Sequence, residues 1–506
     1  MNLRQIPTLR VISSLIFSVF LLKGVFLSLL VPIFQNPDEQ IHYGTVQHWA
    51  EPQEKDWEIR EIGRRDSISS DISTYGLSEE VIRSAQSVQF DEIKFEKQNV
   101  QNFSQSTEDE ILRNDWKHHV DTYPTSASGT KSVYYGIAAW LERLLSDESI
   151  FTRIFAMRLL GVLFGLGTVI LTYLTARKIG FPEELSLLFT TIIAFQPMLS
   201  ITGAQVNIDI ALVFAFSLFF YASISFMKDT DWRHALLAVF AAILGLFSKG
   251  PGIVLVVLLY PLSFWFAHRK LRLPGKRFSV LLVTATLLLT SLLLLIVPRS
   301  YLVNITNFTA QSQFASPFES IGKYLGETLD PGEFRDTSLS YWGQFGWLDS
   351  SIPDWSLSII LFITIVGFAG TVFYLLSRKK IPYLPERKYL ILSLGMIIAL
   401  QIAIRFYDWR VFDYTRKILI GQPGRYFLPN IVPHLLFIVT GIGFLLHRKT
   451  RFILAMKILA LATILLQCHR ECHHPSLLSL KRACKMIPDR TENTRYGFSP
   501  RFFSWE

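Results

Sequence analysis

The sequence predicts an all-α polytopic membrane protein, and three features of its 506 residues support this prediction. Half of the residues are hydrophobic and only 18% are charged, whereas a soluble chain of this length would carry more charge. The hydrophobic residues are gathered into repeated stretches long enough to cross a bilayer. Strongly basic segments separate several of these stretches, at 268–277, 378–380 and 447–451, and such segments are typical of cytoplasmic loops.

About eleven stretches have the length and hydropathy of membrane-spanning helices, and counts from ten to thirteen fit the sequence. They lie at about 11–34, 155–176, 185–201, 208–227, 235–248, 252–267, 278–298, 355–377, 389–405, 426–446 and 452–467. The two stretches around Lys249 are short, so they could also form a bent hairpin that does not cross fully. Residues 1–467 are therefore predicted to form one multi-pass domain.

The first stretch sets the expected orientation. It is too long for the apolar core of a signal peptide, and Arg4 and Arg10 precede it, so it predicts a retained helix with a cytoplasmic N-terminus in a bacterial cytoplasmic membrane. Alternation of the later spans then places all three basic segments inside. Two large segments, 35–150 and 299–354, are expected on the outer side.

The net charge of +9 is unevenly distributed along the chain. Segment 35–150 holds 22 of the 41 acidic residues but only 11 of the 50 basic ones. The remaining positive charge lies mainly between apolar stretches, where it fixes orientation and contacts anionic lipid headgroups. We therefore expect membrane lipids as partners and no nucleic acid.

The C-terminal tail, 468–506, carries 7 Lys+Arg against 4 Asp+Glu. An odd number of spans puts it outside, which conflicts with the charge rule. All three cysteines, Cys468, Cys472 and Cys484, lie in this tail, and their spacing with nearby histidines matches no standard zinc pattern. We expect a tail that is disordered or lies on a surface, with metal binding as the lesser alternative.

The segment FQNPDEQIHYGTVQHW, residues 34–49, directly follows the first span. Asn36 and Pro37 are suited to a helix start, and carboxylates in a first turn are favourable, so Asp38 and Glu39 could simply begin a helix. In such a helix His42 shares a face with Asp38. A carboxylate with an imidazole one turn on, just outside the hydrocarbon, could also act as a general base on a hydroxyl.

Four stretches in order resemble a bacterial family of multi-pass proteins of unknown function that is related to the GT-C glycosyltransferases. They are NPDEQIHY (36–43), QPMLSITGAQVNIDIAL (196–212), FGWLD (345–349) and GQPGRYFLPNIVP (421–433). The first resembles a PPDE-x-x-H signature and the last a QGRYFLP element. The sequence departs from the family pattern in two places: Asn36 replaces the first proline, and KSVYY (131–135) lacks the prolines of P-P-x-x-Y.

The resemblance implies a GT-C-like fold, shared with protein O-mannosyltransferases and the aminoarabinose transferase of lipid A. Those enzymes take a sugar from a polyprenyl-phosphate carrier at the outer leaflet, and an acidic residue of the first outer loop removes the proton of the acceptor. Carried over by motif, Asp38 is the expected base and Glu39 the second candidate. Arg425 and the adjoining Tyr426 belong to the matching GRY element, where Arg425 is expected to grip the carrier phosphate.

Other residues are weaker candidates for substrate binding. Arg410 lies in an outer segment that is unusually basic, and Arg158 and Lys249 are charges close to membrane depth. Each could neutralise a lipid phosphate, and Arg158 or Lys249 could instead snorkel or pair with Asp209. Trp347 belongs either to an interfacial aromatic belt or to a sugar platform.

The sequence therefore predicts an inverting membrane glycosyltransferase for cell-envelope glycans. It would use a polyprenyl-phosphate sugar as donor and a glycan, lipid or protein hydroxyl as acceptor. No cofactor is required, although Asp38 and Glu39 could ligate Mg²⁺ or Mn²⁺. The alternatives are a transporter or flippase for lipid-linked glycans and a non-catalytic assembly subunit.

Overall fold

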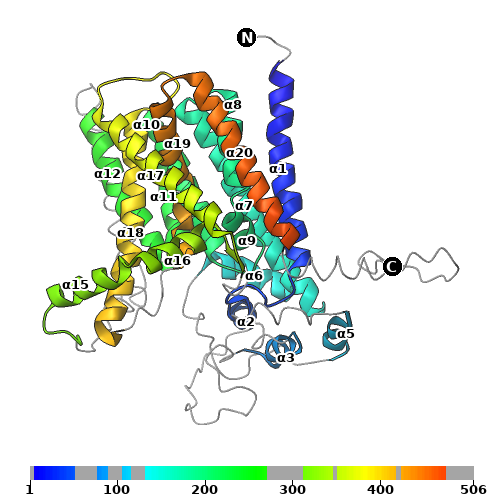
Figure 1. Cartoon of the computed structure of the whole chain (residues 1–506). Coiled ribbons are helices and arrows are strands. Elements are labelled where there is room, and N and C mark those ends of the chain that lie inside the picture. The colour runs from blue at the N-terminus through cyan, green and yellow to red at the C-terminus, as the bar shows by residue number, and fades with distance from the viewer. Residues whose placement is uncertain are drawn as a thin grey trace.

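The chain forms a bundle of long apolar helices (Figure 1). The structure is a computed structural model that describes residues 5–51, 77–88, 105–114, 132–270, 312–345, 350–416 and 423–473. Among these residues seven helices are long and apolar enough to cross a membrane, or eight if one bent pair is a single span. The prediction of an all-α polytopic membrane protein is thus confirmed.

Six of the seven are α1 (Gln5–Leu30), α7 (Ile150–Ile179), α10 (Asp209–Asp229), α17 (Asp354–Leu376), α18 (Arg387–Thr415) and α20 (Lys449–His473). The seventh joins the short 3₁₀ helix η3 (Gly424–Asn430) to α19 (Ile431–Leu446). The bent pair is α8 (Glu183–Ala194) and α9 (Pro197–Gly203), which meet at 61°. Two shorter apolar helices, α11 (Trp232–Leu246) and α12 (Ile253–Lys270), flank the 3₁₀ turn η2 (Gly250–Gly252).

Helices occupy ten of the eleven predicted spans, and the predicted span 278–298 lies outside the described residues. Two predictions need correction. The first helix ends at Leu30 rather than at Phe34, and the stretch predicted as one span at 185–201 is broken after Ala194. Pro197 at the start of α9 explains the break, because a proline removes a backbone donor and disfavours helix in the residue before it.

Short elements gather at one end of the bundle, which we call the loop end (Figure 1). They are α2 (Glu39–Ala50), α3 (Glu79–Ser87), α5 (Gln105–Arg113), α6 (Val133–Leu144), α15 (Pro317–Thr328) and α16 (Pro331–Trp342), with the strands β1 (Gln344–Phe345) and β2 (Ser350–Ser351). The strands pair antiparallel, with Phe345 opposite Ser350. The N-terminal half of α1 extends to the opposite end (Figure 1).

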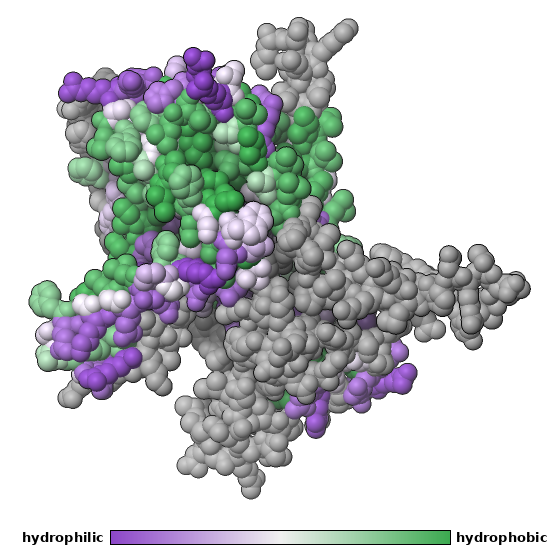
Figure 2. Space-filling view, viewed as in Figure 1, coloured by the Kyte–Doolittle hydropathy of each residue, from purple (hydrophilic) through white to green (hydrophobic). Residues whose placement is uncertain are grey.

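The outer surface of the bundle is apolar around its middle and hydrophilic toward both ends (Figure 2). Large hydrophobic side chains point outward from α17, where Phe362 is 68% exposed and Ile365 is 63% exposed. In contrast, α10 is almost fully enclosed by its neighbours. This arrangement is the one expected when lipid covers the outside and one central helix is shielded from it.

Close helix contacts in the bundle depend on glycine. Helices α17 and α19 pack along each other, and a Cβ atom at Gly441 would overlap the carbonyl oxygen of Gly367. Without a hydrophobic driving force in lipid, such close backbone contact through small residues is a main source of helix association.

Candidate functional site

The start of α2 differs from the predicted helix start. The helix begins at Glu39 and not at Pro37, and Asn36 does not cap it with its side chain; its backbone carbonyl accepts the Glu39 amide at 3.3 Å. Asp38 precedes the helix in the left-handed region, with φ 63° and ψ 8°. A non-glycine residue in this region is strained, and such strain persists where surrounding contacts fix the residue, often at functional sites.

The Asp38 side chain is directed at the GRY element. Its Oδ2 atom accepts from Arg425 Nη2 at 2.6 Å, although the two residues lie 387 positions apart. The Asp38 side chain is 40% exposed, whereas that of Arg425 is 12% exposed. A carboxylate open to the surroundings therefore meets a largely buried guanidinium, and the two residues come from two of the motifs on which the family resemblance rests.

A second ion pair lies beside the first. Lys249 Nζ donates to Asp209 Oδ1 at 2.5 Å and stands 4.2 Å from the centre of the Tyr426 ring. The Arg425 guanidinium is 5.7 Å from the same ring. Burial lowers the pKa of Lys249, but the Asp209 carboxylate more than offsets this, so the pKa lies above its usual value and the ammonium stays charged.

His42 lies among these charges. Its Nδ1 atom is 2.6 Å from the hydroxyl of Tyr135, and the charges of Asp38, Asp209, Lys249 and Arg425 all act on it. Burial lowers the pKa of His42 to about 4, although the two carboxylates oppose this. Burial also raises the pKa of the Tyr135 hydroxyl. At neutral pH a neutral imidazole therefore faces a protonated phenol.

Glu39 occupies a different environment from its neighbour Asp38. It is 0% exposed and forms a two-pronged ion pair with Arg158, at 2.8 Å from Nε and 2.6 Å from Nη2. The same carboxylate accepts the backbone amides of Phe34 and Val206, each at 3.1 Å. Arg158 also donates to the carbonyls of Ser28, Val31 and Pro32 near the end of α1.

These contacts fill the hydrogen-bonding positions of Glu39 and Arg158 and tie α1, α7 and the segment before α10 together. The arrangement is typical of a buried structural ion pair rather than of a substrate-binding site, whose side chains keep hydrogen-bonding positions open. Asp38 and Glu39 also do not form one ligand pair here, because Glu39 faces Arg158. Among the described residues no group of three or more His, Cys, Asp or Glu side chains is placed to hold a metal ion.

Arg410, another predicted residue, is not part of this cluster. Arg410 lies on α18, 3.7 Å from Asp413 and close to the ring of Trp409, and the end of α18 lies beside α15, away from α2 (Figure 1). Trp347 lies outside the described residues. The site that the structure assembles is therefore Asp38, His42, Asp209, Lys249, Arg425 and Tyr426, with Tyr135 behind His42.

Sequence reasoning missed Asp209 and Tyr135 as members of this site. Asp209 was named only as a possible partner of Arg158 or Lys249. Its carboxylate accepts from Lys249, and Asn207 accepts the Asp209 amide at 2.7 Å. The Asn207-Ile208-Asp209 pattern and the unusual Lys-Gly-Pro-Gly turn at 249–252 were the available signals. A pair between Lys249 and Asp209 was one of the alternatives that the sequence left open, and the structure contains it.

A second buried polar cluster holds the rest of α2. Arg153 binds the carboxylates of Glu80 and Glu142, with Glu142 at 2.6 Å. Tyr43 donates to Glu142 at 3.2 Å, and Gln47 donates to Glu80 at 3.1 Å. The cluster joins α2, α3, α6 and α7 next to the candidate site.

Residues 21–434 match the family described as predicted membrane protein (DUF2142), which covers most of the chain. The chain belongs to this family, whose function is unknown. No curated protein matches the chain.

Proposed function

We propose that this member of the family is a GT-C-type glycosyltransferase, which moves a sugar from a polyprenyl-phosphate carrier to a hydroxyl acceptor at the outer face of the bacterial cytoplasmic membrane. One observation carries the proposal. An open carboxylate, Asp38, and two cations, Arg425 and Lys249, converge from distant segments at the loop end of a membrane bundle.

Asp38 is the base in this proposal. It takes the proton of the acceptor hydroxyl, and the hydroxyl oxygen then attacks the anomeric carbon from the face opposite the phosphate. The bond between that carbon and the phosphate oxygen breaks, and its electron pair leaves with the polyprenyl phosphate. The product has inverted configuration at the anomeric carbon.

Arg425 has an N–H donor that remains available to bind the leaving phosphate. Its Nη2 donates to Asp38, whereas its buried Nε has no hydrogen-bond partner among the described residues. An unmade bond at a buried donor is costly, so an anion at this position would be stabilised. Lys249 lies 4.2 Å from the centre of the Tyr426 ring, which Arg425 also approaches, and adds a second positive charge. Two cations in a partly dry site would balance the charge that develops on the leaving group.

His42 is proposed to position the acceptor. With a pKa of about 4 it is neutral at physiological pH, and its Nδ1 atom shares a hydrogen bond with the Tyr135 hydroxyl. Its other ring nitrogen can then donate to or accept from a sugar hydroxyl. Glu39 and Arg158 support the geometry of the site by fixing the backbone on which Asp38 stands.

A transporter or flippase for lipid-linked glycans is the rival function. The 61° break between α8 and α9 favours it, because broken helices build the substrate sites of many transporters. Those sites lie near the bilayer midplane, however, whereas the charged cluster here lies at the loop end, beside α2. This position favours an enzyme that works at the membrane boundary.

The direct test is product analysis with purified full-length protein. The protein is incubated with a panel of polyprenyl-phosphate sugars and hydroxyl acceptors, and release of polyprenyl phosphate is measured. Asp38→Asn should slow transfer by about 10²–10⁴-fold, the usual contribution of a general base. The matched control is Asp354→Asn, since Asp354 is 73% exposed and pairs with Arg335 on the surface.

Arg425→Gln tests the phosphate role, with Arg335→Gln as its matched control. Loss of the guanidinium should raise the apparent KM for the lipid donor, whereas the control should leave it unchanged. Full activity of Asp38→Asn would remove the proposed base. If the unmodified protein shows no transfer and no donor hydrolysis with any member of the panel, the result would favour the transporter or a non-catalytic assembly subunit.

A further inference from the structure

Helix α15 (Pro317–Thr328) carries a different kind of residue on each of three sides. The side packed against the protein is polar and buried, and it consists of Ser320, Tyr324 and Thr328. A second side is apolar and consists of Phe318, Ile321, Leu325 and Leu329, the last directly after the helix. The third side is charged, lies opposite the apolar one, and consists of Glu319, Lys323 and Glu327.

The apolar side of α15 faces away from the protein. Phe318 is 87% exposed and Leu329 is 74% exposed. A helix on the surface of a water-soluble domain has the reverse arrangement, since its apolar side faces the core. The inverted pattern of α15 indicates that an apolar medium lies outside it.

Hydrogen bonds to the end of α18 hold the polar side of α15 in place. The Tyr324 hydroxyl donates to Asp408 Oδ2 at 2.8 Å, and Trp409 Nε1 donates to Ser320 Oγ at 3.1 Å. The ring of Tyr324 also packs against Phe412, with 5.7 Å between the ring centres. Asp408 is 0% exposed, and a buried carboxylate requires a donor of this kind. These contacts fix the rotation of α15 about its axis and keep its apolar side turned outward.

Both ends of α15 lie near the height at which neighbouring helices enter the membrane. The apolar span of α18 is Arg387–Asp413, so α15 contacts it within its last two turns. Helix α16 follows α15, and its Arg335 pairs with Asp354, the first residue of the α17 span. The next residue, Trp355, is 68% exposed, and tryptophan is enriched where a membrane meets water. Helix α15 runs across the direction of the bundle helices at this height (Figure 1).

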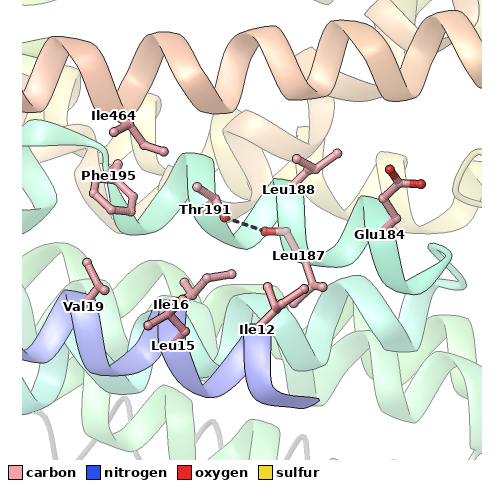
Figure 3. A pocket seen from close by; sticks show the side chains of 10 residues that line it. All are labelled: Ile12, Leu15, Ile16, Val19, Glu184, Leu187, Leu188, Thr191, Phe195 and Ile464. Carbon is pink, nitrogen blue, oxygen red and sulfur yellow. Dashed lines mark hydrogen bonds between the residues drawn. The ribbon is translucent and has the colours of Figure 1, made fainter. Parts of the chain in front are cut away.

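The apolar side of α15 continues the lipid-facing surface of the bundle. That surface is apolar around its middle, and the groove between α1, α8 and α20 belongs to it, with a mostly hydrophobic lining (Figures 2 and 3). In Figure 2 the arm that α15 forms at the lower left is green along the edge next to this apolar surface and purple below it. A helix that lies in the plane of a membrane interface has this arrangement, because it buries one apolar side and keeps the opposite charged side in water.

We propose that α15 is an interfacial helix whose partner is the lipid leaflet at the loop end. Its apolar side enters the boundary between headgroups and acyl chains, and its charged side faces water. The charged side holds two acids and one base, and Lys323 pairs with Glu319 at 2.8 Å, so attachment depends on apolar area and not on anionic headgroups. The site at Asp38 takes no part in this contact, so the inference is independent of the proposed glycosyltransferase activity.

Site-directed spin labelling of the full-length protein in lipid nanodiscs tests the proposal. The native cysteines, Cys468, Cys472 and Cys484, are replaced by serine, and one label is attached at Leu325→Cys on the apolar side. The matched control is Glu327→Cys, two residues away on the charged side of the same helix. Collision rates are measured with oxygen, which concentrates in the bilayer, and with a water-soluble nickel chelate. The Leu325→Cys label should lie about 5–10 Å below the headgroup level, whereas the Glu327→Cys label should lie in water.

The ratio of oxygen to nickel collision rates should be several-fold higher for Leu325→Cys than for Glu327→Cys, and equal in phosphatidylglycerol and phosphatidylcholine nanodiscs. Ile321→Cys repeats the measurement if Leu325→Cys does not fold. A high nickel rate at Leu325→Cys would show that the apolar side faces water. Low rates with both reagents would show that protein covers it, from this chain or from a second copy. A label depth that requires phosphatidylglycerol would show that headgroup charge causes the attachment. Any of these results would overturn the proposal.

Discussion

The adjacent acids Asp38 and Glu39 should respond in opposite ways to the loss of one charge. We predict that Glu39→Gln strongly destabilises the protein and that Asp38→Asn leaves its stability almost unchanged. The two substitutions are chemically identical and one residue apart, so the difference between them reports only on the surroundings of each carboxylate.

The expected magnitudes follow from burial and partners. Glu39 is 0% exposed and balances Arg158, whose guanidinium is enclosed with it. Removing one partner of a buried ion pair leaves an uncompensated charge and costs about 3–5 kcal/mol. Asp38 is 40% exposed, and an ion pair of a carboxylate this open contributes about 0–1 kcal/mol. Arg158→Met should cost at least as much as Glu39→Gln, because it also leaves the carbonyls of Ser28, Val31 and Pro32 without their donor.

The assay is thermal denaturation of each variant in the same detergent. Glu39→Gln should lower the midpoint by on the order of 10 °C, and Asp38→Asn by less than about 2 °C. Equal midpoints for the two variants would refute the structural role of Glu39. A large loss of stability in Asp38→Asn would show that Asp38 belongs to the scaffold, and its activity loss could then not be read as loss of a base.

Three further outcomes are expected. Burial holds the pKa of His42 at about 4, below its value in the unfolded chain, so the unfolded state binds more protons between pH 6.5 and about 4. The free energy of unfolding should therefore fall on acidification through this window. In the His42→Gln variant it should fall less, and denaturation midpoints measured against pH test this. Gly441→Ala should cost about 1–3 kcal/mol by forcing α17 and α19 apart, whereas Gly395→Ala, which meets open space, should be neutral or stabilising in the same thermal assay. Arg153→Met leaves Glu80 buried without its cation, so α3 should detach and become sensitive to limited proteolysis, and an unchanged digestion pattern would contradict this.

Hydrophobic patterning was sufficient to place the long helices. A span such as 355–377 is apolar throughout and stands between polar segments, so its length alone identifies it, and α17 covers Asp354–Leu376. Boundaries were less certain where one residue changes the local geometry. Pro197 breaks a stretch that is apolar on both sides, and the left-handed conformation of Asp38 starts α2 two residues later than its capping signals indicate.

The site could be predicted only in part, for a physical reason. Asp38 and Arg425 were each named as site candidates from separate motifs, without a predicted contact, and the structure places them 2.6 Å apart. Glu39 and Arg158 could not be assigned to the scaffold from sequence, because an acid beside Asp38 and a cation near a membrane boundary look equally suited to binding. Their burial arises from the packing of α1 against α7, which is a long-range contact without a local sequence signal.

The contact between Asp38 and Arg425 is compatible with catalysis by Asp38 only if the pair opens when substrate binds. The cluster holds two carboxylates, Asp38 and Asp209, and two cations, Arg425 and Lys249, so its charges balance when no ligand is present. A phosphate would first bind at Nε of Arg425, which is unpaired among the described residues, and would then compete with Asp38 for Nη2. The strained backbone at Asp38 and the rigid anchor at Glu39 would then keep the freed carboxylate in place, because the chain on its C-terminal side is fixed by Arg158 and Val206. Donor binding and activation of the base would thus be coupled through one guanidinium.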